Sequence, residues 1–232
     1  MSFSNVNMEL PPNFSGLARL FPLPNLVLFP GVMQGLHIFE PRYRELMKDS
    51  LAADELITIS LLKPKWELSA NEQPPVYETV CVGKIVTHTE TEDGRFDLLL
   101  IGAQRAKIIR EVHSGKPYRL AQVELVSEPE VDQLGQLSSL RAELIQTFRD
   151  FARARNFLEN ESIQQLLENE VPFGLLADLV GFSTGAGCHQ LQEVLETTNL
   201  ETRGRKVLEL MQSCLDQDRE SSGDFPPKFS QN

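Results

Sequence analysis

The spacing of apolar residues changes near the middle of this 232-residue sequence, and this change limits the possible folds more than any other feature. In the first half, Ala121, Val123 and Leu125 alternate with polar residues, which is typical of a strand with one buried face. In the second half, the spacing is three or four residues, as at Leu134, Leu137, Leu140, Leu144, Phe148 and Phe151. This spacing predicts amphipathic helices. The chain is therefore expected to be α+β, with strands first and helices second.

The first half predicts several short strands and one helix. Strands are expected over residues 80–88, 95–101 and 121–125, with turns at residues 92–94 and 114–117. Within the first strand, Val80, Val82 and Val86 should share one face and Ile85 the other. A helix is expected over residues 41–53. Such a set favours a small, strongly curved sheet or a partly closed barrel.

The second half predicts a helical bundle. Helices are expected over residues 133–155, 162–168, 172–180, 188–197 and 201–216, and Asn199 is the expected amino-terminal cap of the last. The predicted organisation is a flexible tail at residues 1–17, a β-rich subdomain at 18–127, a helical subdomain at 128–218 and a second flexible tail at 219–232.

Two motifs mark the start of the β-rich half. Residues 20–31 read LFPLPNLVLFPG, a proline-punctuated apolar strand that ends in a turn, and residues 37–44 read HIFEPRYR. Pro41 suits the first turn of a helix, where a missing amide hydrogen leaves no hydrogen bond unmade. Glu40, Arg42 and His37 near it are interpreted as ion-pairing residues that fix the helix entrance, and not as catalytic groups.

These motifs resemble the amino-terminal, substrate-binding domain of the Lon protease family. Further segments resemble it in the same order: VGKIV at 82–86, LIGAQRA at 100–106, LADLV at 176–180 and LETTNLETR at 195–203. The resemblance covers about residues 19–215. It implies a PUA-like pseudo-barrel followed by a helical bundle, and it implies substrate recognition as the role.

The sequence does not contain the phosphate-binding motif of the ATPase module that follows this domain in Lon proteases. The two Gly-Lys pairs, at Gly83 and Gly115, are not followed by Ser or Thr. A region corresponding to the family's proteolytic domain is not found either. The chain is therefore expected to be a stand-alone Lon-type domain and not an enzyme.

Charge and cysteine content argue against a nucleic-acid-binding protein, a disulfide-bonded protein and a metal-binding protein. The net charge is −11, and residues 1–126 hold 13 basic and 15 acidic residues, against 9 and 18 in the remainder. This balance opposes nucleic-acid binding. The cysteines Cys81, Cys188 and Cys214 are isolated, and no His or Cys has a partner at metal-ligand spacing, so free thiols without a metal or cofactor are expected. With no targeting signal and no apolar run long enough to span a membrane, a cytoplasmic protein is predicted.

Glycines in the strands have two interpretations. Gly83 and Gly102 could let a ligand approach the backbone, but strand glycines more often mark bulges or tight bends. Arg105 is expected to cap the bend at Gly102.

The leading functional hypothesis is a non-catalytic module that binds polypeptide segments or a partner protein. The predicted lip of the site is the loop at residues 63–76, which carries the sole tryptophan. The predicted contact residues are Trp66, Phe21, Leu23, Phe29 and Met33, and Trp66 could equally cover the core.

Two alternatives remain open, whereas nothing in the sequence supports a peptidase in its own right, because no arrangement of nucleophile, base and oxyanion-stabilising groups is recognisable. The chain could be a subunit that works with a separate ATP-dependent protease. It could also be a PUA-like RNA-binding protein that uses a basic patch of Arg105, Lys107, Arg110, Lys116 and Arg119, with Tyr118 as a stacking residue.

Overall fold

The computed structural model describes residues 9–68, 73–128, 137–157, 164, 167 and 171–223. The chain forms two compact units. One comprises Met1–Glu130 together with Gly187–Thr198, and the other comprises Val131–Ala186 together with Asn199–Asn232. Residues 187–198, which the helical period assigns to the helical subdomain, therefore group with the sheet.

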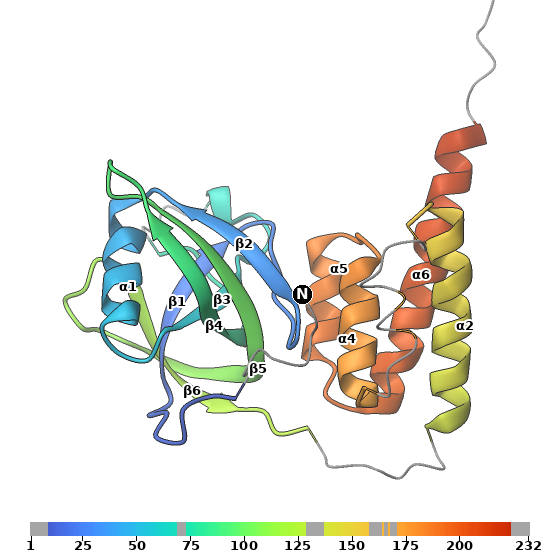
Figure 1. Ribbon diagram of the computed structural model, residues 1–232, viewed down its shortest axis with the longest axis horizontal. Helices are drawn as coiled ribbons and strands as arrows, with labels where there is room; N and C mark the ends of the chain where they lie inside the picture. The colour runs from blue at the N-terminus through green and yellow to red at the C-terminus, as the bar shows by residue number, and fades with distance from the viewer. Residues whose placement is uncertain are drawn as a thin grey trace, which may run out of the picture. The chain divides into compact units, whose positions relative to one another are not determined.

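The first unit contains a six-stranded mixed sheet. Its strands are β1 Leu17–Leu23, β2 Met33–Ile38, β3 Leu56–Leu61, β4 Thr79–Glu90, β5 Phe96–Val112 and β6 Arg119–Leu125, in the order β2-β5-β4-β3-β1-β6. An additional pairing of β5 with β6 closes the sheet on itself, as Figure 1 shows, and leaves β2 attached to the side of β5. The expected curved sheet or pseudo-barrel is thus confirmed.

Strand β5 makes the closure possible because its length allows it to pair with β6 as well as with β2 and β4. Its first residues pair with β2, and its residues from Ala106 to Val112 pair with β6, where the register shifts between Ile108 and Arg110. Such irregularities increase local bending and twist. Closure leaves fewer unpaired strand edges, which would otherwise expose backbone donors and acceptors.

A second irregularity overturns one detail of the predicted strand faces. Val80 and Val82 are buried as expected, but Ile85 is also buried, whereas Val86 is 38% exposed. The register of β4 against β5 shifts between Val82 and Gly83 and again between Ile85 and Thr87. These shifts reverse the alternation, so the prediction that Val86 shares a face with Val80 was wrong.

The interior of the barrel is lined by small and branched apolar side chains. Contacts among them define a core of Ala18, Leu20, Leu56, Val80, Val82, Ala106, Ala121 and Val123, all at most 5% exposed. Strand β3 is buried along its whole length. This core holds the strands that carry the site described below.

Helix α1, Pro41–Leu51, follows β2 and begins as predicted. Pro41 lies in its first turn, Glu40 is its amino-terminal cap residue, and Leu46 and Met47 are fully buried. The side chains of Arg42 and Glu40 form an ion pair at 2.8 Å. His37 pairs with Asp97 at 2.7 Å between Nδ1 and Oδ1. The expected helix entrance and its ion pair between Arg42 and Glu40 are confirmed, whereas His37 contacts its cross-strand neighbour on β5 and does not fix the entrance.

The predicted turn before β5 is also present. Gly94 has a φ of +75°, a region that favours glycine, and the amide of Thr91 donates to the carbonyl of Arg95 at 2.9 Å. The side chain of Asp93 accepts from the Thr91 hydroxyl at 2.6 Å. Backbone and side chain together close this hairpin.

Helix α5, Cys188–Glu196, comes late in the sequence but belongs to the first unit. The side chain of Gln192 donates to the carbonyl of Thr79 in β4 at 2.9 Å. The hydroxyl of Tyr77 lies 3.2 Å from Nδ1 of His189. These contacts fix α5 to the strand β4 and to the segment before it.

The second unit is formed by α2 Ser138–Ala154, α4 Phe173–Ser183 and α6 Leu200–Gly223. Helices α2 and α6 run side by side in Figure 1 and share an extensive contact. The predicted apolar stripe of α2 is buried, with Leu144, Phe148 and Phe151 at 0% exposure. Asn199 caps α6, since its side chain accepts from the amide of Thr202 at 2.9 Å. The expected bundle is confirmed.

Four sequence-based ranges lie partly outside the described residues. Of the helix predicted at 162–168, only residues 164 and 167 are described, and both are helical. Residues 133–136, 1–8 and 224–232 are also not described, so for residues 1–8 and 224–232 the flexible tails remain predictions. The last helix extends to Gly223, seven residues beyond its predicted end at 216, so residues 219–223 are helical and the predicted start of the second tail was wrong.

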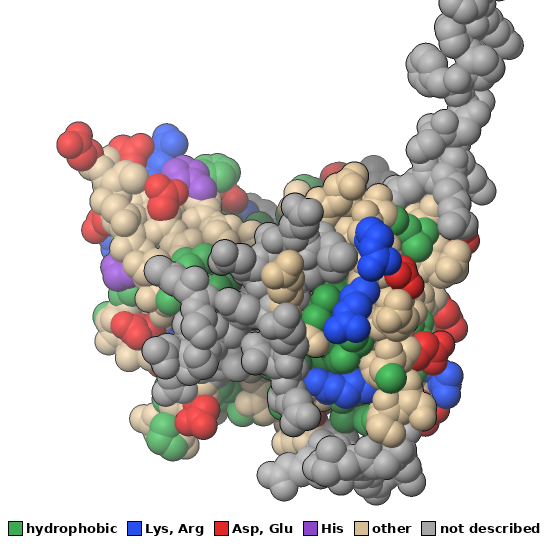
Figure 2. All heavy atoms as spheres, turned by 45° about the vertical axis from the view of Figure 1, so that its right-hand side comes forward, with side chains coloured by type: hydrophobic (Ala, Val, Ile, Leu, Met, Phe, Trp, Pro, Cys, Tyr) green, Lys and Arg blue, Asp and Glu red, His purple; other side chains and the backbone are tan. Residues whose placement is uncertain are grey.

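The bundle contains a buried ion pair between α4 and α6. Arg203 Nη1 lies 3.3 Å from Asp178 Oδ1, and both side chains are at most 1% exposed. On the surface of this unit, Arg153 pairs with Asp150 and Arg205 pairs with Glu201, each at 2.9 Å. Figure 2 shows both basic and acidic side chains exposed on one face of the protein. The named pairs therefore neutralise part of the exposed charge on these helices.

The three cysteines are free thiols. Within the described residues, no group of three or more His, Cys, Asp or Glu side chains could hold a metal ion. A search of the same residues finds no helix that is long and apolar enough to cross a membrane.

Candidate functional site

A cleft of about 770 Å³ opens in the first unit where β1 ends. Five segments supply its walls: the end of β1, the start of α1, the end of β3, the loop at residues 63–76 and the start of β6. The lining residues are Pro22, Leu23, Pro24, Glu40, Arg42, Tyr43, Leu62, Trp66, Glu67, Gln73, Pro74, Pro117, Tyr118 and Arg119.

The cleft forms because the ladder between β1 and β6 stops early. Leu20 pairs with Arg119 as the last described partners of this antiparallel ladder. Continuing the same register would place Pro117 opposite Pro22. Neither proline has an amide hydrogen to donate, so the ladder cannot be extended by regular hydrogen bonds there.

On its other side, β1 remains paired to its end. The register with the parallel strand β3 continues through Leu23, and the Leu23 carbonyl accepts from the amide of Leu62 at 2.9 Å. Because neighbouring residues of a strand direct their backbone groups to opposite edges, Pro22 directs its groups away from β3. The edge of β1 toward the cleft therefore ends in a proline, and Pro24 follows directly after the strand.

Aromatic side chains line the cleft around these prolines. Tyr43 stacks in a tilted arrangement on Phe21, with ring centroids 4.4 Å apart, and the guanidinium of Arg42 lies 4.5 Å from the Tyr43 ring centroid. Burial raises the pKa of the Tyr43 hydroxyl. Trp66 begins the short helix η2, Trp66–Leu68, and is partly exposed. Tyr43 is 5% exposed and presents only the edge of its side chain to the cleft, so Trp66 provides the more accessible ring surface.

Tyr118 is fixed by a polar contact behind the cleft. Its hydroxyl donates to Asp49, whose carboxylate also pairs with Lys116 at 2.7 Å. Burial, with the hydrogen bond to Asp49 as a second cause, raises the pKa of Tyr118 to about 12. The hydrogen bonds from Lys116 and Tyr118 lower the pKa of Asp49. The phenol therefore stays protonated at neutral pH and holds its ring in place.

Most charges in the cleft are neutralised by neighbours. Arg42 pairs with Glu40, as described above. Arg119 Nε donates to Glu111 at 2.9 Å, and Arg119 Nη1 donates to the carbonyl of Pro74 at 2.7 Å. This last bond attaches the loop at residues 63–76 to the start of β6. Glu67 is the exposed lining carboxylate to which no described residue is ion-paired.

The lining of the cleft is mixed in chemistry. Apolar and aromatic side chains share it with Glu40, Arg42, Glu67, Gln73 and Arg119, so its surface is about as polar as it is apolar. A ligand in the cleft can therefore combine apolar contacts with polar ones.

The structure brings together two of the five predicted contact residues. Leu23 and Trp66 both line the cleft. Phe21 and Phe29 are 5% and 0% exposed, so they lie in the core, and Phe21 acts by supporting Tyr43. Met33 lies on β2 opposite Ile101 and does not line the cleft.

Sequence reasoning missed Tyr43, Tyr118 and Pro117 as members of this site. Tyr43 was included only within the helix-entrance motif, and Tyr118 only in the RNA-binding alternative. Their shared location depends on the register of β1 with β6, which places Pro117 and Tyr118 next to the end of β1. The prolines in both segments are the signal in the sequence that could have revealed it.

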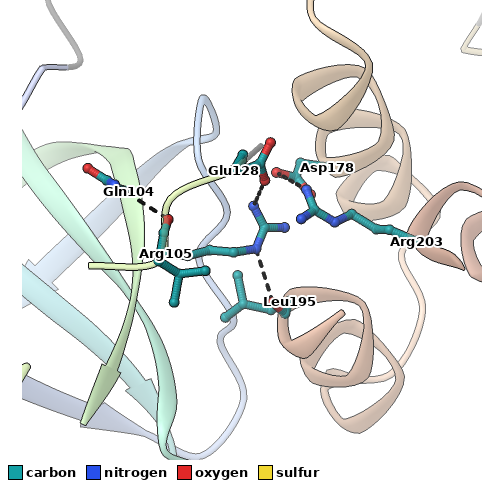
Figure 3. A network of polar contacts seen from close by, with 7 residues as sticks. Gln104, Arg105, Glu128, Asp178, Leu195 and Arg203 are labelled. Carbon is teal, nitrogen blue, oxygen red and sulfur yellow. Dashed lines mark hydrogen bonds and ion pairs between the residues drawn. The ribbon is translucent and has the colours of Figure 1, made fainter. Parts of the chain in front are cut away.

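The basic patch considered for RNA binding does not form as expected. Arg105 is 1% exposed, and its Nε donates to the carbonyl of Leu195 at 3.0 Å while its Nη1 pairs with Glu128 at 2.9 Å (Figure 3). The expectation that Arg105 caps the bend at Gly102 was wrong, because the side chain instead reaches the last turn of α5. Lys116 pairs with Asp49, and Arg119 pairs with Glu111.

The two strand glycines have different roles. Gly83 lies at a register shift, as expected of a bulge. Gly102 instead allows close approach of another segment, since a Cβ there would lie 2.0 Å from the carbonyl oxygen of Phe29. The amides of Gly31 and Gly102 bond the carbonyls of Gly102 and Val32 at 2.8 and 2.9 Å.

Comparison with known proteins gives a consistent result. Residues 18–213 match the ATP-dependent protease La (LON) substrate-binding domain. The chain is 26% identical over 188 residues to a Lon protease of Dictyoglomus thermophilum, and 28% identical over 203 residues to Lon protease 2 of Myxococcus xanthus. These matches cover 81% and 83% of this chain but 23% of each relative, so the chain spans about a quarter of their length.

Solved structures support the fold. The N-terminal domain of a Mycobacterium avium complex Lon protease superposes with a TM-score of 0.67 at 17% identity, covering 84% of this chain and 98% of that one. A Lon N-terminal domain protein from Xanthomonas campestris gives 0.60 at 18% identity, covering 83% and 97%. The match over most of its length shows that the chain belongs to the family of the LON substrate-binding domain.

Proposed function

We propose that this protein is a non-catalytic module that binds unfolded or extended polypeptide segments in the cleft at the end of β1. One observation carries the proposal. Leu23, Tyr43, Trp66 and Tyr118 come from four separate parts of the chain and line one cleft. Membership of a substrate-binding family supports the same role.

The size of the cleft supports this ligand class. Its volume of about 770 Å³ falls in the range of about 300–1,000 Å³ that is usual for ligand sites. Its walls are also held in place before a ligand arrives, because Arg119 bonds the Pro74 carbonyl and Tyr118 bonds Asp49. A site with fixed walls loses less entropy on binding.

The charge distribution supports an apolar mode of binding. The two arginines that line the cleft are both paired with glutamates, so little net charge is available to attract phosphate. Apolar burial depends little on salt, whereas phosphate binding falls steeply with it. The same pairing weakens the RNA-binding alternative.

The alternatives that involve a protease remain compatible with this role. The chain spans about a quarter of the length of the Lon proteases that it matches. If it works with a separate protease, the cleft would still bind the polypeptide segment, and the protease would cleave it. The free thiols support a reducing compartment and hence the proposed cytoplasmic location.

Trp66 provides a direct test because it is the sole tryptophan of the chain. Its fluorescence should change on titration with a tryptophan-free unfolded polypeptide, such as reduced and carboxymethylated ribonuclease A, and not with the folded form. Leu23→Ser should weaken this binding at least about fivefold through loss of buried apolar surface. Leu36→Ser is the matched control, because Leu36 is also partly buried but lies on β2 and does not line the cleft.

Circular dichroism should show that both variants remain folded. If the two variants bind equally well to the unfolded probe, or if Trp66 does not respond while binding occurs, the cleft is not the site. If no binding of the unfolded probe is found by any method, the proposed function is wrong.

A further inference from the structure

The cleft differs from a strand-addition site in the chemistry of its edge. A peptide that extends a sheet needs alternating donors and acceptors on the edge strand. At the end of β1 the last outward position is Pro22, and Pro117 would stand opposite it if the register with β6 continued past Leu20 and Arg119. Proline offers a carbonyl but no amide, so this edge provides no donor at those positions.

The side chains of the cleft provide contact surface for a ligand where the backbone provides no hydrogen-bond donor. Leu23, Tyr43 and Trp66 offer apolar and aromatic surface. Such surfaces accommodate apolar side chains without any requirement for hydrogen bonds from the peptide backbone.

Glu67 adds a charge preference at the rim. It is exposed, follows Trp66 directly and lines the cleft, and no described residue forms an ion pair with it. The other charged lining residues, Glu40, Arg42 and Arg119, already have partners of opposite charge. A basic residue in the ligand can therefore pair with Glu67 without displacing an existing bond.

We propose that the cleft selects an extended segment by its side chains alone, with an apolar residue against Leu23, Tyr43 and Trp66 and a neighbouring basic residue paired with Glu67. This inference rests on the proposed function and specifies the class of segment that the cleft accepts. Because a proline on this edge supplies no amide donor, a backbone carbonyl of the ligand finds no hydrogen bond there, and a regular added strand does not form.

The test uses fluorescence anisotropy with a labelled peptide, Gly-Ser-Leu-Phe-Lys-Ser-Gly, and the full chain. One derivative carries N-methyl groups on the Leu and Phe amides, a second replaces Lys by Glu, and a third replaces both Leu and Phe by Ser. N-methylation should leave the dissociation constant within about twofold. The change of Lys to Glu should weaken binding about two- to fivefold, as for an exposed ion pair.

Charge reversal in the protein gives the matched test. Glu67→Lys should reverse the preference, so that the Glu peptide binds better than the Lys peptide. Glu92→Lys is the control, because Glu92 is exposed in the turn before β5 and does not line the cleft. It should leave the preference unchanged, although it alters the net charge equally.

The outcomes separate the two claims. Loss of binding on N-methylation, tenfold or more, would show that the segment adds to the sheet as a strand and would overturn the inference while the proposed function stands. The same conclusion follows if Glu67→Lys and Glu92→Lys shift the preference equally. Equal binding of the peptide in which both Leu and Phe are Ser would instead contradict the apolar cleft itself.

Discussion

Leu23, at the end of β1, and Trp66, at the start of η2, line one cleft although they belong to elements far apart in the sequence. They meet there because β1 continues its pairing with β3 while its pairing with β6 stops at Leu20. The end of β1 is thus fixed on one side and open on the other. This leaves an opening at the end of β1 that is lined by aromatic rings and prolines, and we propose it as the binding site.

Arg105 should be among the most important residues for the stability of the first unit. Arg105→Met removes its bonds to the Leu195 carbonyl and to Glu128, and it leaves buried acceptors unsatisfied. We expect a loss of about 2–4 kcal/mol in the free energy of unfolding. Glu128→Gln should cost less than about 1 kcal/mol, because Glu128 is 35% exposed. Urea denaturation of both variants tests the difference, and equal losses would contradict it.

Gly102 should tolerate no side chain. In Gly102→Ala the new Cβ would collide with the Phe29 carbonyl, so the loop before β2 must shift, at a cost of about 1–3 kcal/mol or more. Gly35→Ala is the matched control, because nothing lies within 4 Å of a Cβ there. Its effect should stay within about 0.5 kcal/mol. Thermal unfolding measures both, and a stable Gly102→Ala would show that the close approach is not obligatory.

The buried pair of Asp178 and Arg203 should show strong coupling. Removing one partner, as in Arg203→Met or Asp178→Leu, takes the ion-pair partner away from a buried charge, and each change should cost about 3–5 kcal/mol. The double variant should be more stable than either single variant, since no buried charge is left. A double-mutant cycle by chemical denaturation measures the coupling. Additive losses would mean that the two side chains stabilise the bundle independently.

Tyr118 should make stability depend on pH in the alkaline range. Its pKa is raised from about 10 to about 12 in the folded state, so its contribution is complete below pH 10 and is lost as pH rises through 12. Tyr118→Phe should lower the free energy of unfolding by about 1 kcal/mol at pH 7. The difference between the two proteins should narrow from pH 10 upward. A constant difference up to pH 12 would exclude this titration as a source of stability.

Much of the fold could be predicted because it depends on local patterns. The period of α2, the cap at Asn199, the turn at Gly94 and the start of α1 at Pro41 each depend on residues close in sequence. The reversed faces at Ile85 and Val86 could not be predicted, because the register shifts against β5 decide them. The role of Arg105 depends on Leu195, a partner 90 residues away.

The site was predicted only in part for the same reason. Trp66 and Leu23 were identified as apolar residues near strand ends and in a loop. Phe21 and Phe29 have the same character in the sequence, but the packing of Tyr43 on Phe21 and the approach of Phe29 to Gly102 bury them. Tyr118 joins the site through strand register, which a single sequence does not specify, and Tyr43 joins it through the packing of α1 on Phe21.

Site-specific crosslinking shows whether an unfolded polypeptide enters the cleft at the end of β1. Benzoylphenylalanine is placed at Gln73, an exposed residue that lines the cleft, and in a second protein at Glu92, an exposed residue that does not. Each is irradiated with reduced and carboxymethylated ribonuclease A. The account predicts a crosslinked product from position 73, reduced by Leu23→Ser, and little product from position 92. Equal yields from the two positions, or a yield at position 73 that Leu23→Ser leaves unchanged, would contradict a polypeptide-binding cleft at the end of β1.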